Sequence, residues 1–145
     1  MPAEYSAGAI IFKKAEDLTL YLILHYEEGH WGSAKGHIEG REAIEETACR
    51  EIREETGLTD IRFIEGFQAE NQYFFNSQDR RIHKTVTFLL AQTWTSEIRI
   101  SDEHTEYVWL PYAEALEKIT FQNEKTVLEK AHDFLNQKDR QGIVK

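Results

Sequence analysis

The fold is decided by residues 36–58, which read GHIEGREAIEETACREIREETGL. A helix advances by about 100° per residue, so the acidic positions of this segment can be placed on a wheel. Glu51, Glu54 and Glu55 then share an arc of roughly 100°. Carboxylates crowded on one face repel each other unless a cation lies among them. The segment therefore predicts a metal site that is carried on a helix.

The same segment carries the signals of a loop followed by a helix. We expect the loop at about residues 28–40 and the helix at about residues 42–56. Gly57 is suited to end this helix, because a C-terminal cap often needs a left-handed conformation. Apolar residues recur every four positions and predict the stripe that faces the core: Ile44, Ala48 and Ile52.

The rest of the chain mixes strand-like and helical patterns. Runs rich in β-branched and aromatic residues predict strands at residues 5–13, 18–26, 84–94 and 106–110, and a further strand-like run at 61–75 that is interrupted near Gly66 and followed by a polar turn at 76–81. Helices are expected at residues 111–118 and 123–136, with a loose tail at residues 137–145. Strands interspersed with a few helices predict an α/β or α+β sandwich, with helices covering a sheet. The length of 145 residues predicts a single domain, residues 1–145.

Composition limits the classes of function. The formal net charge is −9 and no long basic tract is present, which argues against a general nucleic-acid-binding protein. No apolar run approaches the roughly 20 residues that cross a bilayer, so no membrane association is expected. A single cysteine, Cys49, excludes an internal disulfide and favours a reducing compartment. We therefore expect a cytoplasmic protein.

The acidic helix also indicates a chemistry. Hard oxygen ligands suit Mg²⁺, with Mn²⁺ as the alternative, and both ions bridge to phosphates. Arg50 lies four residues before Glu54, where a charged hydrogen bond can orient that carboxylate. An oriented carboxylate beside activated water is a candidate general base. The alternative interpretation is a solvated acidic helix without a site.

The spacing of residues 36–58 resembles the Nudix box. It places Gly36 six positions before Glu42, and Glu42 eight positions before the run REIREETGL at residues 50–58. The resemblance implies an α/β/α sandwich with a mixed sheet and metal-dependent hydrolysis of a nucleoside diphosphate linked to another group. It also implies roles for individual residues: the metal ligands Glu51, Glu54, Glu55 and the Gly36 carbonyl, the base Glu54, and the positioning residues Glu42 and Arg50.

Segments outside the box resemble one branch of that family. Residues 31–37, WGSAKGH, are similar to the Trp-x-x-Pro-Lys-Gly-His loop of asymmetrical diadenosine tetraphosphate hydrolases of the animal and archaeal kind. Further similarities follow in chain order up to about residue 135: Glu65-Gly66-Phe67, Tyr73, Lys84-Thr85-Val86, residues 97–104, Tyr107-Val108-Trp109-Leu110 and Phe121. The chain departs at Ala34, where that family usually has proline. Alanine is expected to loosen the loop by adding backbone freedom.

This resemblance implies a small-molecule substrate, a dinucleoside polyphosphate, and cleavage to ATP and AMP by water attack on the fourth phosphate. A polyphosphate needs cations, which Lys35 and Lys84 can supply, and either His37 or His104 can donate to phosphate oxygens. Adenine needs a flat apolar partner, for which Tyr73 and Phe121 are suited. The resemblance also adds Glu103 as a carboxylate ligand of the metal.

Other functions stay open from the sequence. A Nudix enzyme can act instead on a nucleoside triphosphate, a nucleotide sugar or the 5′ end of RNA. A non-catalytic nucleotide-sensing module on the same fold is a second alternative, although such modules often lose box carboxylates and this chain keeps all of them. An acidic calcium buffer is a third, but the chain lacks the spacing of known calcium loops.

Overall fold

The sheet is organised around its first strand. The computed structural model describes residues 2–140, and in it β1 (Ala3–Ala15) runs through the middle of an eight-stranded mixed sheet. Side chains alternate between the two faces of a strand. Ile10 and Phe12 accordingly belong to one apolar cluster, whereas Ala9 and Ile11 belong to the other. Strand β1 therefore supplies both cores of the protein.

The sheet divides along β1. β7 (Arg80–Gln92) runs parallel to β1 along one edge. On the other edge, β4 (Ala34–His37) pairs with the first half of β1, and β2 (Leu18–Tyr26) pairs with the second half. β2 then leaves β1 and pairs with β8 (His104–Pro111) and the short β3 (Trp31–Gly32). This fork opens the space in which the candidate site lies.

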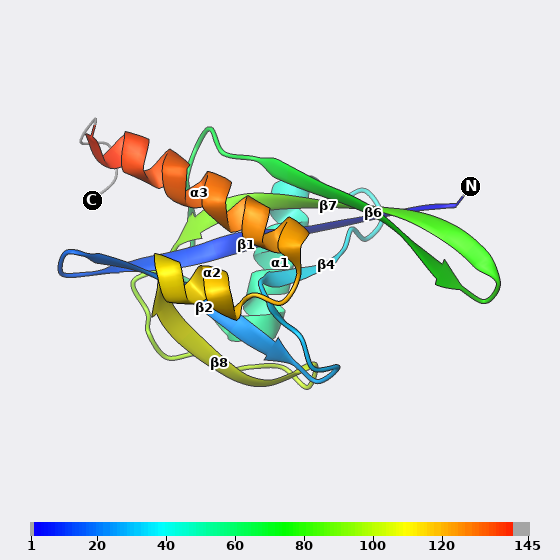
Figure 1. The fold of residues 1–145 in the computed structure, drawn as a ribbon, viewed down its shortest axis with the longest axis horizontal. Helices are drawn as coiled ribbons and strands as arrows, with labels where there is room; N and C mark the ends of the chain where they lie inside the picture. Colours follow the sequence, from blue (N-terminus) through cyan, green and yellow to red (C-terminus); the bar gives the residue numbers. More distant parts are fainter. Residues whose placement is uncertain (1, 141–145) are drawn as a thin grey trace.

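A long hairpin extends from the body of the molecule (Figure 1). It consists of β6 (Ala69–Ser77) and β7, joined by Gln78 and Asp79, which have positive φ values of 51° and 63°. Positive φ at both central residues is the geometry of the tightest hairpin turns. The short β5 (Arg62–Phe63) pairs with the other end of β7.

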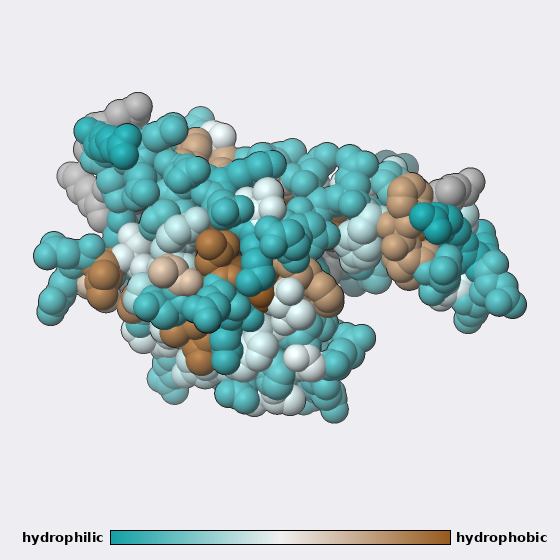
Figure 2. Space-filling model, in the orientation of Figure 1, coloured by the Kyte–Doolittle hydropathy of each residue, from teal (hydrophilic) through white to brown (hydrophobic). Residues whose placement is uncertain are grey.

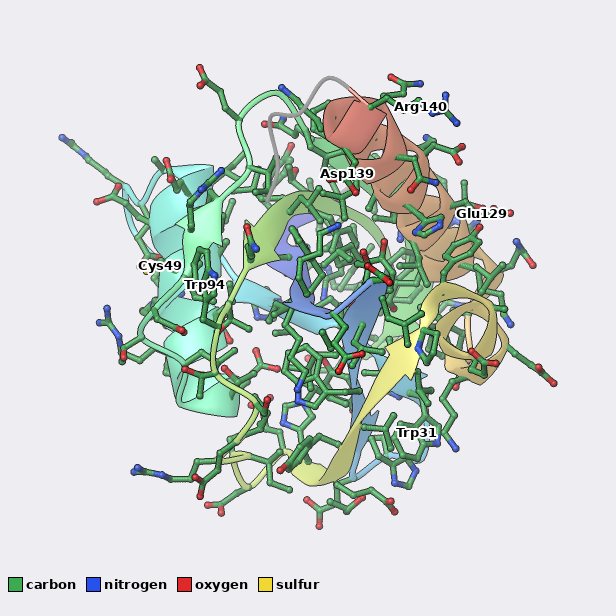
Figure 3. The ribbon with its side chains drawn as sticks, turned by 90° about the vertical axis from the view of Figure 1, so that its left-hand side faces the viewer. Trp31, Cys49, Trp94, Glu129, Asp139 and Arg140 are labelled. Carbon is green, nitrogen blue, oxygen red and sulfur yellow. The ribbon has the colours of Figure 1, made fainter. Side chains whose placement is uncertain are left out.

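Helices cover both faces of the sheet. α1 (Ile44–Thr56) lies on one face, and α2 (Tyr112–Lys118) and α3 (Gln122–Arg140) lie on the other (Figure 1). In the side view, the helices that carry Cys49 and Glu129 stand on opposite sides of the sheet (Figure 3). One core cluster packs under α2 and α3, and the second packs under α1. The predicted α/β/α sandwich with a mixed sheet is thus confirmed.

Most element boundaries match the predictions, and the exceptions have identifiable causes. Gly57 does cap α1, with a φ of 75°. The helix begins at Ile44 rather than residue 42, because Ala43 has an extended backbone and its amide donates to the Glu46 side chain, which caps the first turn. Residues 28–40 are not only a loop, since they contain β3 and β4. Residues 137–140 continue α3 and are not a tail, and residues 141–145 lie outside the described part.

The fork depends on a close backbone approach at Gly8. This glycine pairs with Lys35 across β1 and β4, and a Cβ added to it would lie 2.1 Å from the Ala34 carbonyl oxygen. We expect Gly8→Ala to destabilise the protein by about 1–3 kcal/mol, because backbone atoms must shift to admit the methyl group. Urea unfolding measures the change. A variant as stable as the parent would contradict the close approach.

The surface is mainly hydrophilic. Figure 2 shows small, separate apolar patches on a predominantly polar face. The large apolar side chains that are most exposed are scattered along the chain: Tyr5, Leu18, Phe74, Trp94 and Phe121. None of the helices within residues 2–140 is long and apolar enough to cross a bilayer.

Candidate active site

A cleft of about 880 Å³ lies at the fork of the sheet. That volume is in the range of small-molecule and cofactor sites, which is about 300–1,000 Å³. Its lining comes from both sides of the fork, from the α1 helix and from the start of α3. The lining includes most of the residues that the sequence predicts for the site: Lys35, Gly36, His37, Glu51, Tyr73, Lys84, Glu103 and Phe121.

Gly36 and Glu51 meet at the floor of the cleft. Gly36 belongs to β4 and Glu51 to α1, and a Cβ at Gly36 would lie 2.1 Å from the Glu51 carboxyl carbon. The absence of a side chain at Gly36 leaves room for the Glu51 carboxylate beside the strand. The predicted backbone ligand and one predicted carboxylate ligand are therefore adjacent.

Glu55 is a buried carboxylate that lacks a hydrogen-bonded partner within residues 2–140. Burial, the neighbouring Glu51 carboxylate and the Glu103 charge together raise the pKa of Glu55 to about 10, so without a cation this group holds a proton at neutral pH. His104 Nε2 lies 3.2 Å from Glu55 Oε1. Burial lowers the pKa of His104 to about 4, however, so this imidazole is neutral and does not compensate a negative charge.

These carboxylates fit a divalent cation. A buried carboxylate without a partner charge takes up a proton, and a bound cation would reverse this and stabilise the ionised form, so the Glu55 oxygens mark a position for positive charge. The mutual repulsion of Glu51, Glu55 and Glu103 is the effect that a bound cation reverses. The available donors are hard oxygens, as Mg²⁺ prefers.

Arg50 connects the loop to the acidic helix. Its guanidinium donates to both Glu42 oxygens at 2.8 and 3.0 Å and to the His37 carbonyl at 2.9 Å. It also donates to Glu51 at 2.7 Å and to Glu54 at 3.0 Å. Because the fork of five donors is planar and rigid, these contacts fix several groups in one geometry. The predicted pairing of Arg50 with Glu54 is confirmed.

The three box carboxylates lie on one helix, as the wheel predicts, but they differ in burial. Glu55 is buried, Glu51 is half-buried in the cleft, and the Glu54 side chain is 52% exposed and is not among the cleft-lining residues. Within residues 2–140, no three His, Cys, Asp or Glu side chains form a ready-made metal cluster. The reason is Arg50, which draws Glu51 and Glu54 toward its own charge.

Glu42 should determine part of the acid stability. The Arg50 guanidinium lowers the pKa of Glu42 to about 2, from 4.5 for a free glutamate. The ionised carboxylate therefore stabilises the fold above about pH 4.5, and this contribution disappears as the pH falls toward 2. We expect Glu42→Gln to be less stable than the parent at neutral pH, with a difference that shrinks through this window. Urea unfolding at a series of pH values measures it.

The control for this change is Glu45→Gln, at an exposed glutamate on the same helix. It should leave the pH dependence of unfolding as in the parent. A Glu42→Gln variant whose stability deficit is constant from neutral pH to about pH 2 would contradict the assigned pairing.

The predicted substrate residues line the cleft, and their binding roles stay predictions. Tyr73 of β6 and Lys84 of β7 are direct cross-strand partners. Burial lowers the pKa of Lys84 and raises that of Tyr73. The Phe121 ring is 49% exposed. His37 Nε2 lies 3.1 Å from the Glu4 carboxylate, so an acidic partner competes for this imidazole.

The cleft also contains residues that sequence reasoning did not assign to a site, among them Tyr26, His30 and Glu124. The His30 ring stacks on Tyr26 with centroids 4.3 Å apart and lies 5.2 Å from the Phe121 ring. Nothing beside His30 in the sequence indicates a site, so no local signal could have identified it. The buried Glu124 accepts a hydrogen bond from the Ser33 amide, so residues 31–37 are held despite Ala34.

Comparison with known proteins identifies the family. The mouse (Mus musculus) asymmetrical bis(5′-nucleosyl)-tetraphosphatase is 38% identical over 142 residues, which cover 90% of this chain and 94% of that protein. The pig (Sus scrofa) protein of the same name is 35% identical over the same shares. The crystal structure of a C. elegans Ap4A hydrolase binary complex superposes with a TM-score of 0.80 at 24% identity, covering 92% of this chain and 98% of that one. The family model of the NUDIX domain matches residues 3–130, and the chain belongs to the Nudix family.

Proposed function

We propose that the protein hydrolyses diadenosine tetraphosphate and related dinucleoside polyphosphates to ATP and AMP. The observation that carries this proposal is one cleft that combines carboxylates, two lysines and aromatic rings. Such a set matches the three parts of the substrate: the reacting phosphate, the polyphosphate chain and the base. The similarity to the mouse and pig tetraphosphatases supports the substrate class.

A divalent cation, Mg²⁺ or alternatively Mn²⁺, is the proposed cofactor. Glu51, Glu55, Glu103 and the Gly36 carbonyl would hold it, because they are the hard oxygen donors gathered around the orphaned carboxylate. When bound, such an ion polarises phosphoryl oxygens and lowers the pKa of the attacking water. Glu54, expected from the sequence both as a ligand and as the base, is proposed as the base that accepts the proton of the water.

The remaining cleft residues would position the substrate. Lys35 and Lys84 attract the phosphate chain, and His37 donates to one of its oxygens. Tyr73 and Phe121 offer aromatic surface for stacking on a base, which is worth about 1–3 kcal/mol per base. Because Tyr73 and Lys84 are neighbours across β6 and β7, a stacked base and the adjoining phosphates would lie on the same hairpin.

A substrate panel tests the proposal. The protein is incubated with Mg²⁺ and, separately, with diadenosine tetraphosphate, a nucleoside triphosphate, a nucleotide sugar and RNA with a 5′ triphosphate. We expect the highest kcat/KM for the dinucleotide, because only this substrate fills both the base-stacking and the metal ends of the cleft. A higher kcat/KM for any other substrate would assign the enzyme to that substrate instead.

We further propose that the protein acts in the cytoplasm on this small molecule, without membranes or nucleic acids as general partners. The single cysteine supports a reducing compartment. The net charge of −9 disfavours broad binding to nucleic acid.

A further inference from the structure

Glu124 is a cleft carboxylate that belongs to α3 rather than to the acidic helix. It lies in the first turn of α3, is 4% exposed and lines the cleft. Buried carboxylates need a partner charge or donors. The groups that contact the Glu124 carboxylate therefore indicate its role.

The carboxylate of Glu124 is fixed against the strands β3 and β4. Its Oε1 accepts the Ser33 amide hydrogen at 2.8 Å. A Cβ on Gly32 would lie 2.7 Å from the same oxygen, so the glycine at this position allows the close approach. The remaining oxygen, Oε2, lies 3.5 Å from the Lys35 ammonium. Glu124 thus binds the Ser33 backbone amide and pairs with the Lys35 ammonium, both in the segment that leads to Gly36.

Lys35 is engaged by the protein itself. Its ammonium lies between Glu124 and the Tyr26 ring, 5.1 Å from the ring centroid, and its side chain is only 18% exposed. Lys84, the other lysine of the cleft, makes no salt bridge with any residue from 2 to 140, and the negative charge that acts on it, Glu4, lies beyond salt-bridge distance. The two lysines of the cleft are therefore not equivalent, because only Lys35 has a carboxylate within salt-bridge distance of its ammonium.

We propose that Glu124 is a positioning residue that restrains Lys35 and competes with phosphate for its ammonium group. The inference rests on the proposed function in taking Lys35 as a phosphate-binding residue. Its consequence is that the protein without metal binds phosphate anions weakly. Phosphate compounds then bind in the cleft with useful affinity only when a bound metal ion also attracts them.

The test is a double-mutant cycle read out by calorimetric binding of inorganic tripolyphosphate in EDTA. Glu124→Gln keeps an oxygen for the Ser33 amide and removes the charge, and we expect it to bind about tenfold more tightly than the parent. Lys35→Met should cost at most about threefold in the parent but about tenfold in the Glu124→Gln background. A gain of affinity is not produced by structural damage, so a purely structural role for Glu124 would not give this result.

Two variants serve as controls. Glu129→Gln makes the same change of net charge on the exposed face of α3 and should not alter the affinity. Lys84→Met should weaken tripolyphosphate binding by the same factor in the parent and in the Glu124→Gln background, because Lys84 makes no salt bridge with Glu124. No gain in Glu124→Gln, or a Lys35→Met effect that is equal in both backgrounds, would overturn the proposal.

The single variant Lys35→Met keeps the proposal testable if Glu124→Gln does not fold. A loss of tenfold or more in that variant in EDTA would show that Lys35 is free, and would overturn the restraint. None of these measurements involves hydrolysis. A different nucleotide substrate would therefore disprove the proposed function and leave this inference intact.

Discussion

Glu54→Gln should abolish most of the turnover while substrate binding is retained. Loss of a general base typically lowers kcat by about 10²–10⁴-fold. The amide is nearly isosteric with the carboxylate, so it can still accept the Arg50 hydrogen bond at 3.0 Å. Initial rates with diadenosine tetraphosphate give kcat, and calorimetry with a non-hydrolysable analogue gives the affinity.

This experiment also separates an enzyme from a nucleotide-sensing module. A sensor would bind the analogue equally well and would show no turnover to lose. The matched control is Glu45→Gln, which makes the same charge change at an exposed position of α1 and should keep full activity. If Glu54→Gln retained the parent's kcat, another group would have to take the proton of the water.

Arg50→Met should have the second large effect, on stability and activity together. Removing the guanidinium leaves Glu42, Glu51 and Glu54 without their shared partner, and leaves the His37 carbonyl without its donor. Because the arginine side chain is 24% exposed, we expect a loss of about 3 kcal/mol, at the low end for a broken buried ion pair. Urea unfolding measures the loss, and it should be smaller when Mg²⁺ is present, because a cation then compensates part of the repulsion.

Arg53→Met is the control for this variant. Arg53 is an exposed arginine of the same helix, and its side chain makes no ion pair with residues 2–140. Equal losses in Arg50→Met and Arg53→Met would mean that general charge, rather than the network around Arg50, stabilises the acidic helix.

Local patterns predicted the elements that depend on local interactions. β2 spans Leu18–Tyr26, as the run of apolar and aromatic residues indicates, and Gly57 caps α1. β4 was not predictable in the same way, because its strand conformation comes from pairing with residues of β1 that lie far away in sequence. The continuation of α3 to Arg140 also lacks a local signal, since a polar, charged end of a helix resembles a tail.

The same division applies to the site. The four-residue spacing of Arg50 and Glu54 fixes their contact on any helix, and that contact is present. At about 100° per residue, however, Glu55 falls between Ile44 and Ala48, inside the apolar stripe, so the wheel already contained the reason for its burial. No local signal indicated that Glu124 lines the cleft, because its hydrogen-bond partner Ser33 is 91 residues away in the sequence.

In the proposed reaction, water attacks the fourth phosphate of the dinucleotide. Product analysis in isotopically labelled water tests this directly. The protein is incubated with diadenosine tetraphosphate and Mg²⁺ in water enriched in ¹⁸O, and the products are resolved by mass spectrometry. We expect equal amounts of ATP and AMP, with the label in AMP. The attacked phosphorus becomes the phosphate of AMP, and ATP is the leaving group. Two molecules of ADP, label in ATP, or no turnover would contradict it.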